Sequence, residues 1–108
     1  MKDDLEISIE VGDDTIVVHV RGEIDRANAD RLEQGLDDAT RNSVPRIVDL
    51  TGVTFIDSAG LRALQMSAQR APLRIVLPEG ARIARTLKIA GTHEVIPVLA
   101  SIADARNL

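Results

Sequence analysis

The sequence predicts an α/β domain in which helices pack on a mixed, mainly parallel sheet opened by a β-hairpin. Near the start of the chain, apolar residues alternate with polar ones, which is the pattern of half-buried strands. After residue 45, short apolar runs alternate instead with segments of helical periodicity. Such alternation requires right-handed crossovers between parallel strands. The expected order of elements is ββαβαβαβα, in a single domain that spans residues 1–108.

Two strands and a helix are expected in the first forty residues. Alternation over residues 5–11 and again over 16–20 predicts the strands, and Gly12-Asp13-Asp14 between them has the chemistry of a hairpin turn. Residues 22–28 are expected to be a polar connection that ends at Asn28, a residue typical of N-caps. Apolar positions at helical spacing then predict a helix that reaches about Ala39.

The second half of the chain begins with a nearly continuous apolar run, Ile47–Leu50, which is typical of a central strand covered on both faces. A helix is expected to follow and to end near Ala71-Pro72, because the residue before a proline disfavours helical dihedrals. The remaining expected elements are a strand over residues 73–77, a helix over 83–90, an edge strand over 95–98 that contains Pro97, and a short helix opened by Ser101.

Composition narrows the class of function. The 108 residues carry a formal net charge of −4, and Phe55 is the single aromatic residue. Because nucleic acids are bound by clustered cations and stacked on aromatic rings, no direct nucleic-acid partner is expected. The absence of cysteine is consistent with a reducing cytosol. The acidic N-terminus lacks the apolar run of a signal peptide, and no stretch approaches the ~20 apolar residues of a membrane span. We therefore expect a cytoplasmic module.

The segment Asp57-Ser58-Ala59-Gly60 lies where the third strand is expected to lead into a helix. Unpaired backbone N–H groups and the helix dipole favour an anion at such a position, so a phosphoserine at Ser58 is physically permitted. The residues alone leave a second interpretation open, in which Asp57 or Ser58 caps the helix and Gly60 allows close packing of the helix on the strand.

Two other interpretations, a hydrolase and a receiver domain, do not fit the sequence. A hydrolase nucleophile elbow requires glycine two residues before the serine, where this chain has Ile56. A receiver domain requires an acidic pair after the first strand to hold magnesium and a lysine after the last strand. Here Asp13-Asp14 is expected in a hairpin turn and Lys88 within a helix.

Neither histidine indicates catalysis or metal binding. His19 shares an expected outward strand face with Val17 and Arg21, which favours a solvated or cross-strand role. His93 follows the exit of a helix, where a histidine often contacts the last carbonyl groups. No histidine and acidic pair has the spacing of metal ligands. We expect no catalytic residues, no metal site and no cofactor.

Two segments resemble the signature segments of the STAS domain family, and within it most closely the bacterial anti-sigma-factor antagonists. They are Gly22-Glu23-Ile24-Asp25 and the longer, more specific run DLTGVTFIDSAGL from Asp49 to Leu61. The resemblance extends from about residue 5 to 105. It departs from the family at Ala71-Pro72, where glycine is common, and at Glu94-Val95-Ile96, where an aromatic residue is common. These departures leave the subfamily open.

The resemblance implies a phosphorylation switch at Ser58. The partner would be an anti-sigma factor with a histidine-kinase-like fold and serine kinase activity, which holds the ATP and magnesium itself. The unphosphorylated chain would bind this partner and release the sigma factor, and a serine phosphatase would reset the phosphorylated form. The chain would then be no enzyme. The expected partner-binding residues are Asp25, Asp57, Ser58 and Gly60.

An alternative role is also compatible with the resemblance. The chain would then be a STAS module of a stress-signalling assembly or of a lipid-transport system, and Ser58 would be only a helix cap.

Overall fold

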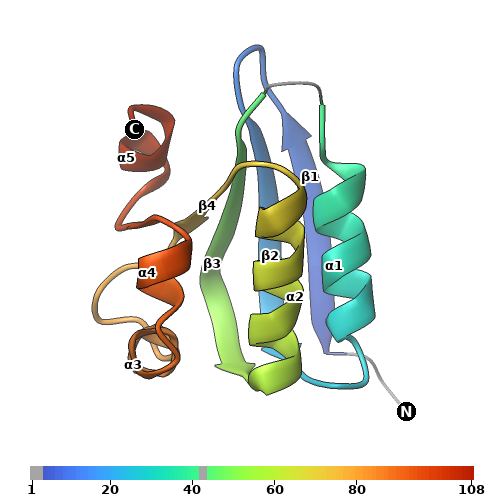
Figure 1. The fold of residues 1–108 in the computed structure, drawn as a ribbon, viewed down its shortest axis with the longest axis vertical. Helices are drawn as coiled ribbons and strands as arrows, with labels where there is room; N and C mark the ends of the chain where they lie inside the picture. The colour runs from blue at the N-terminus through green and yellow to red at the C-terminus, as the bar shows by residue number, and fades with distance from the viewer. Residues whose placement is uncertain (1–3, 42–43) are drawn as a thin grey trace.

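A computed structural model of the chain describes residues 4–41 and 44–108. Residues 1–3, part of the acidic N-terminus considered above, lie outside the description, as do residues 42–43. The described residues contain a five-stranded sheet of order β1-β2-β3-β4-β5 (Figure 1). The strands are β1 (Leu5–Val11), β2 (Ile16–Ile24), β3 (Arg46–Ile56), β4 (Leu73–Val76) and β5 (Val98–Leu99). The first pair is antiparallel and the later pairs are parallel, which confirms the mixed sheet opened by a hairpin.

The helices cover both faces of the sheet. They are α1 (Ala29–Asp38), α2 (Ser58–Arg70), α3 (Ala84–Ile89), α4 (Thr92–Val95) and α5 (Ile102–Arg106). Alternate residues of the central strands separate two cores. Val18 and Val48 belong to the larger core with α1, α2 and α3, whereas Val17 and Ile47 pack with Ala105 of α5 on the other face. Figure 1 shows α1 and α2 side by side in front of the sheet.

The expectation that Val17 points outward is wrong. Its side chain is 1% exposed because α5 covers this part of the sheet. The contact with α5 is distant in sequence, and the residues of β2 do not indicate it. The sequence therefore did not predict which part of this strand face is covered.

Strands β2 and β3 are both longer than predicted. Residues 22–24 continue β2 instead of forming a polar connection, and β3 runs on to Ile56. The two extensions pair with each other, with Gly22 opposite Val53 and Ile24 opposite Ile56. Gly22 has φ +104, and a Cβ there would lie 1.7 Å from the Asp4 carbonyl oxygen, so a residue with a side chain would not fit.

The predicted strand over residues 95–98 is also wrong. Thr92–Val95 form helix α4, and the strand is reduced to Val98–Leu99, so the observed order is ββαβαβααβα. The backbone N–H of Ile96 donates to the Thr92 carbonyl, which keeps this segment helical until Pro97. The edge position is confirmed, since β5 pairs only with β4 among the described strands.

Two helix boundaries agree with the sequence. Helix α2 ends at Arg70, just before Ala71-Pro72. The Ser101 hydroxyl accepts a hydrogen bond of 3.1 Å from the Asp104 backbone N–H, which opens α5 as expected. Within the described ranges, no helix combines the length and the apolar character needed to cross a membrane.

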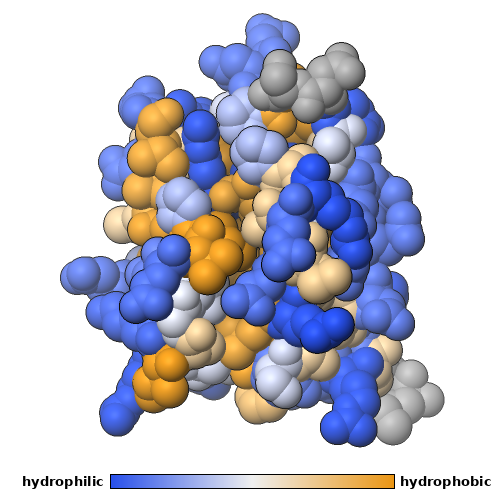
Figure 2. Space-filling view, in the orientation of Figure 1, coloured by the Kyte–Doolittle hydropathy of each residue, from blue (hydrophilic) through white to orange (hydrophobic). Residues whose placement is uncertain are grey.

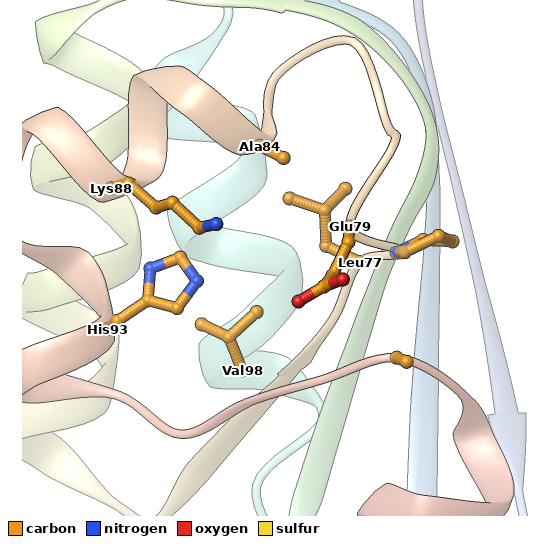
Figure 3. A pocket seen from close by; sticks show the side chains of 8 residues that line it. Leu77, Glu79, Ala84, Lys88, His93 and Val98 are labelled. Atoms are coloured by element: carbon orange, nitrogen blue, oxygen red, sulfur yellow. The ribbon is translucent and has the colours of Figure 1, made fainter.

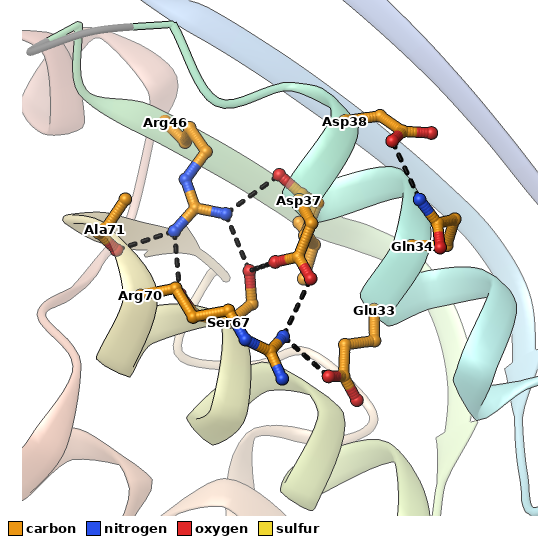
Figure 4. A network of polar contacts seen from close by, with 9 residues as sticks. Glu33, Gln34, Asp37, Asp38, Arg46, Ser67, Arg70 and Ala71 are labelled. Atoms are coloured by element: carbon orange, nitrogen blue, oxygen red, sulfur yellow. Dashed lines mark hydrogen bonds and ion pairs between the residues drawn. The ribbon is translucent and has the colours of Figure 1, made fainter.

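A buried arginine joins the ends of α1 and α2 (Figure 4). The Arg46 guanidinium donates to the carbonyls of Leu36 at 2.8 Å and Ala71 at 2.6 Å, and to the hydroxyl and carbonyl of Ser67. Arg46 is 0% exposed, and burial lowers its pKa. Because the last carbonyls of a helix lack backbone partners within it, this one side chain supplies hydrogen-bond donors at the ends of both helices.

Candidate functional site

The predicted site residues lie at the carboxyl-terminal edge of the sheet. Asp25 follows β2 and Asp57 follows β3, and the strands end as parallel neighbours with Ile24 opposite Ile56. The Asp57 backbone N–H donates to the Ile24 carbonyl at 3.2 Å, which joins the two strand ends. In Figure 1 the arrowhead of β3 lies beside the first turn of α2. The structure therefore brings the Asp25 and Asp57–Ser58 segments to one edge.

Asp57 is the N-cap of α2. Its backbone is extended, with φ −107 and ψ −173, and its Oδ1 accepts hydrogen bonds from the backbone N–H groups of Ala59 at 2.9 Å and Gly60 at 3.1 Å. The sequence left Asp57 and Ser58 as alternative caps. The structure assigns this role to Asp57.

Ser58 is the first residue of α2, and it is exposed. Within the described residues its hydroxyl makes no hydrogen bond, because the cap is made by the residue before it. A hydroxyl that is exposed and unbonded at a helix start is accessible to another protein and can carry an anion there. A modification of the Ser58 hydroxyl would therefore break no hydrogen bond of the described structure.

Gly60 lies inside the fold. A Cβ at this position would lie 2.6 Å from Ile24 Cγ2 and 2.7 Å from Ile56 Cγ1, both in the core. Glycine therefore lets the first turn of α2 approach the ends of β2 and β3 closely. The expected part of Gly60 in partner binding stays a prediction. Its packing role is to bring the first turn of α2, and with it Ser58, close to the edge of the sheet.

Asp25 organises the loop that follows β2. Its Oδ1 accepts a hydrogen bond from the Ala27 backbone N–H at 2.9 Å, and its own N–H donates to Asn28 Oδ1 at 2.9 Å. Asn28 also donates to the Glu23 carbonyl. Asn28 stands at the N-cap of α1, but its side chain makes no capping bond to that helix. The predicted N-cap position is therefore confirmed, but the side chain bonds the preceding loop instead of the helix.

Phe55 gives this edge an apolar surface. The side chain is 47% exposed and lies on β3 opposite Glu23 of β2. The space-filling view shows other hydrophobic residues at the surface, mainly over the C-terminal helices, whereas the α1 side is polar (Figure 2). An exposed aromatic residue near a modifiable hydroxyl suits a surface that another protein covers.

His19 has the predicted cross-strand role. Its Nε2 lies 3.0 Å from Glu10 Oε1 on β1, and its Nδ1 lies 3.2 Å from Asp49 Oδ2 on β3. The hydrogen bond to Glu10 raises the pKa of His19, burial opposes the rise, and Asp49 adds to it. His19 on β2 therefore connects β1 and β3 through side-chain hydrogen bonds. In the described part of the chain, no cluster of three or more His, Cys, Asp or Glu residues could hold a metal ion.

His93 lines a pocket that sequence reasoning missed. Lys88, His93 and Glu79 surround a cavity of about 450 Å³ between α3, α4 and the ends of β4 and β5. These residues come from three separate segments and form no local motif. Only the fold brings them together, so no signal in the sequence could have found the pocket.

A family model and a similar curated protein both place the chain in one family. The family model described as the STAS domain matches residues 6–105. The chain is 29% identical over 102 residues to a protein of Mycobacterium tuberculosis named anti-sigma-F factor antagonist RsfA, a match that covers 87% of this chain and 79% of that protein.

Solved structures show the same fold. The crystal structure of an anti-sigma factor antagonist from Mycobacterium paratuberculosis has a TM-score of 0.85 and 27% identity, over 95% of this chain and 92% of that one. The anti-sigma factor antagonist SpoIIAA in its unphosphorylated form has a TM-score of 0.67 over 93% of this chain and 92% of its own. At 16% identity, the second likeness shows the fold alone.

Proposed function

The chain belongs to the STAS domain family, and on that premise we propose that it is an anti-sigma-factor antagonist switched by phosphorylation of Ser58. Its unphosphorylated form binds an anti-sigma factor in the bacterial cytoplasm and so frees a sigma factor. The names of the similar proteins from the two Mycobacterium species support the antagonist role. The observation that carries the switch is the exposed and unbonded hydroxyl of Ser58 at the start of α2.

The chain is the substrate of this reaction, and the partner supplies the catalytic groups. Ser58 Oγ attacks the γ-phosphoryl group of an ATP that the partner holds with magnesium. The bond between Oγ and phosphorus forms, the bond to ADP breaks, and the hydroxyl proton passes to a base of the partner. We assign the partner a histidine-kinase-like fold with serine kinase activity. A separate serine phosphatase hydrolyses the phosphoserine and restores the binding form.

The fold is suited to carry the phosphate. An anion in the first turn of a helix is stabilised by typically about 0.3–1 kcal/mol. Ser58 is exposed, so the phosphate needs no space within the core. The hydrogen bonds from Ala59 and Gly60 end on Asp57, so α2 stays capped when Ser58 is modified. The modified chain therefore stays folded, and the change is confined to the surface.

The phosphate acts on the interface. It adds about −1.5 to −2 charges at neutral pH, next to Asp57 and on the edge that also carries Asp25. A partner that covers Phe55 and this edge must either remove water from the dianion or leave a gap. A penalty of about 3 kcal/mol reduces affinity roughly a hundredfold. That factor is sufficient for the partner to be released.

Mapping of the phosphorylation site tests the proposal. The chain incubated with its cognate kinase and magnesium ATP gains one phosphate on Ser58, measured by intact mass and peptide mapping, and Ser58→Ala gains none. Three other serines are described: Ser67 is buried and hydrogen bonded, Ser101 caps α5, and Ser8 is exposed on β1. Ser43 lies outside the described residues. Stoichiometric phosphate on any serine other than Ser58 overturns the assignment.

A further inference from the structure

A pocket that carries charged side chains lies away from Ser58, which is not among its lining residues. It has a volume of about 450 Å³, within the range of small-molecule sites. Its lining comes from the segment after β4, from α3 and α4, and from β5. The apolar part of the lining consists of Leu77, Pro78, Ala84, Val98 and Ala100.

Opposite charges face each other across this pocket. Figure 3 shows the Lys88 ammonium and the His93 ring entering from one side and the Glu79 carboxylate from the other. No ion pair joins these side chains to each other or to another residue in the described ranges. The charges are therefore separated by the cavity and are available to a ligand placed between them.

We propose that this pocket binds a free α-amino acid with an aliphatic side chain. The ligand carboxylate is held by Lys88, with His93 beside it, and the ligand ammonium is held by Glu79. Its side chain lies on the apolar wall formed by Leu77 and Val98. Hydrogen bonds between charged groups are the stronger ones, so two such contacts set the orientation of a small ligand.

The charge of the pocket distinguishes this ligand from others of similar size. The charges of the Lys88 ammonium and the Glu79 carboxylate sum to zero, which matches a zwitterion. A nucleotide would bring two or more negative charges against one lysine, and the lining contains no aromatic ring on which a base could stack. A simple carboxylate would leave the Glu79 carboxylate facing a second anion. A zwitterion places its carboxylate against Lys88 and its ammonium group against Glu79, so both charges of the pocket are paired.

Titration of the 108-residue chain with L-leucine, followed by backbone amide NMR shifts, tests the proposal. We expect saturable shifts centred on the pocket residues. Lys88→Met and Glu79→Gln each weaken binding by at least about tenfold, because each removes one charged hydrogen bond. Arg85→Met on α3 and Glu94→Gln on α4 are matched controls outside the lining, and they bind leucine like the unchanged chain.

Two leucine analogues test whether the pocket requires both the carboxylate and the ammonium group of the ligand. Leucinol lacks the carboxylate and 4-methylpentanoate lacks the ammonium group, and both bind more weakly than leucine. The proposal is overturned by the absence of saturable binding up to about 10 mM leucine, a range that would detect even weak sites. It is equally overturned if 4-methylpentanoate binds as tightly as leucine, or if both pocket variants keep full affinity. Ser58→Ala binds leucine normally, so this test is independent of the phosphorylation switch.

Discussion

The carboxylate of Asp57 accepts a hydrogen bond of 3.1 Å from the backbone N–H of Gly60, so α2 is capped by the residue that precedes Ser58. The same oxygen accepts from Ala59 at 2.9 Å. The capping group and the modifiable hydroxyl are therefore two different side chains. If Ser58 is phosphorylated as proposed, this separation leaves the cap of α2 in place.

Stability measurements should separate the two residues. Asp57→Ala removes the cap and lowers the free energy of unfolding by about 0.5–2 kcal/mol. Ser58→Ala removes an exposed and unbonded hydroxyl, and its effect stays within about 0.5 kcal/mol. Urea denaturation of both variants measures the difference. A larger loss for Ser58→Ala than for Asp57→Ala would show that the serine is the cap.

Arg46 is expected to be the most sensitive polar residue of the fold. Arg46→Met removes the donor to the carbonyls of Leu36 and Ala71 and one of the two donors to the Ser67 carbonyl, at a cost of about 3 kcal/mol. The exposed Arg82→Met serves as the matched control and changes stability by less than about 0.5 kcal/mol. Equal unfolding midpoints for the two variants would refute this role of Arg46.

Stability should fall as the pH rises above the unfolded pKa of histidine. The hydrogen bond to Glu10, helped by Asp49, raises the pKa of His19 in the folded chain despite some burial. The folded chain thus holds this proton more tightly, and the stabilisation is present below the unfolded pKa of about 6.5. It is lost as the pH rises through the folded pKa. Because His19 is partly exposed, the loss stays below about 1 kcal/mol.

The control for this pH dependence is His19→Gln. Glutamine does not titrate, so the free energy of unfolding of this variant should be flat from about pH 6 to 8, apart from the shared background. The charged groups around the imidazole are Glu10 and Asp49, with Arg106 of α5 at 4.0 Å from Glu10. An unchanged slope in His19→Gln would assign the effect to another group.

At low pH the carboxylate of Asp49 contributes with the opposite sign. Burial tends to raise the pKa of Asp49, but hydrogen bonds from Thr51 and His19 outweigh it, and the pKa is lowered. Stabilisation by this group is present above its unfolded pKa and is lost as the pH falls through the folded value.

The sequence predicts the fold well where burial alternates locally. The hairpin follows from alternation over residues 5–11 and 16–20, and the end of α2 follows from Pro72. Prediction from the sequence fails where a segment is a strand only because another strand pairs with it. Residues 51–55 of β3 are mostly exposed, and they contain Gly52 and two threonines, a composition typical of a loop. Pairing with residues 21–24 of β2 makes them a strand.

The strand-to-helix turn that carries the candidate site was predictable from the sequence, but the division of roles between its residues was not. The residues Asp57-Ser58 at a strand-to-helix turn indicate a cap and a possible anion site, and local sequence does not say which side chain does which. That depends on the backbone of Asp57, which is extended and turns its Oδ1 toward two N–H groups. The neighbouring position of Asp25 depends on the register of two parallel strands, which no local pattern records.

Asp25 should affect partner binding more than folding. Asp25→Asn keeps the Oδ1 acceptor for the Ala27 N–H and removes the charge, so it should weaken partner binding and leave the melting temperature nearly unchanged. Asp25→Ala should weaken binding similarly and lose up to about 1 kcal/mol of stability, because the loop loses its acceptor. Calorimetric titration and thermal melting measure the two effects. Destabilisation with unchanged affinity in Asp25→Ala would assign the residue to the loop alone.

The central claim is that charge at Ser58 controls binding, and three forms of the chain test it. Titration calorimetry against the nucleotide-bound anti-sigma kinase compares Ser58→Ala, Ser58→Glu and the phosphorylated chain. Alanine keeps the edge neutral and should bind like the unmodified chain, as a permanently active antagonist. Glutamate carries less charge than phosphate, so its affinity should fall between alanine and the phosphorylated chain, which should bind about a hundredfold more weakly. Equal affinities for all three forms would contradict the account and leave Ser58 without a switching role.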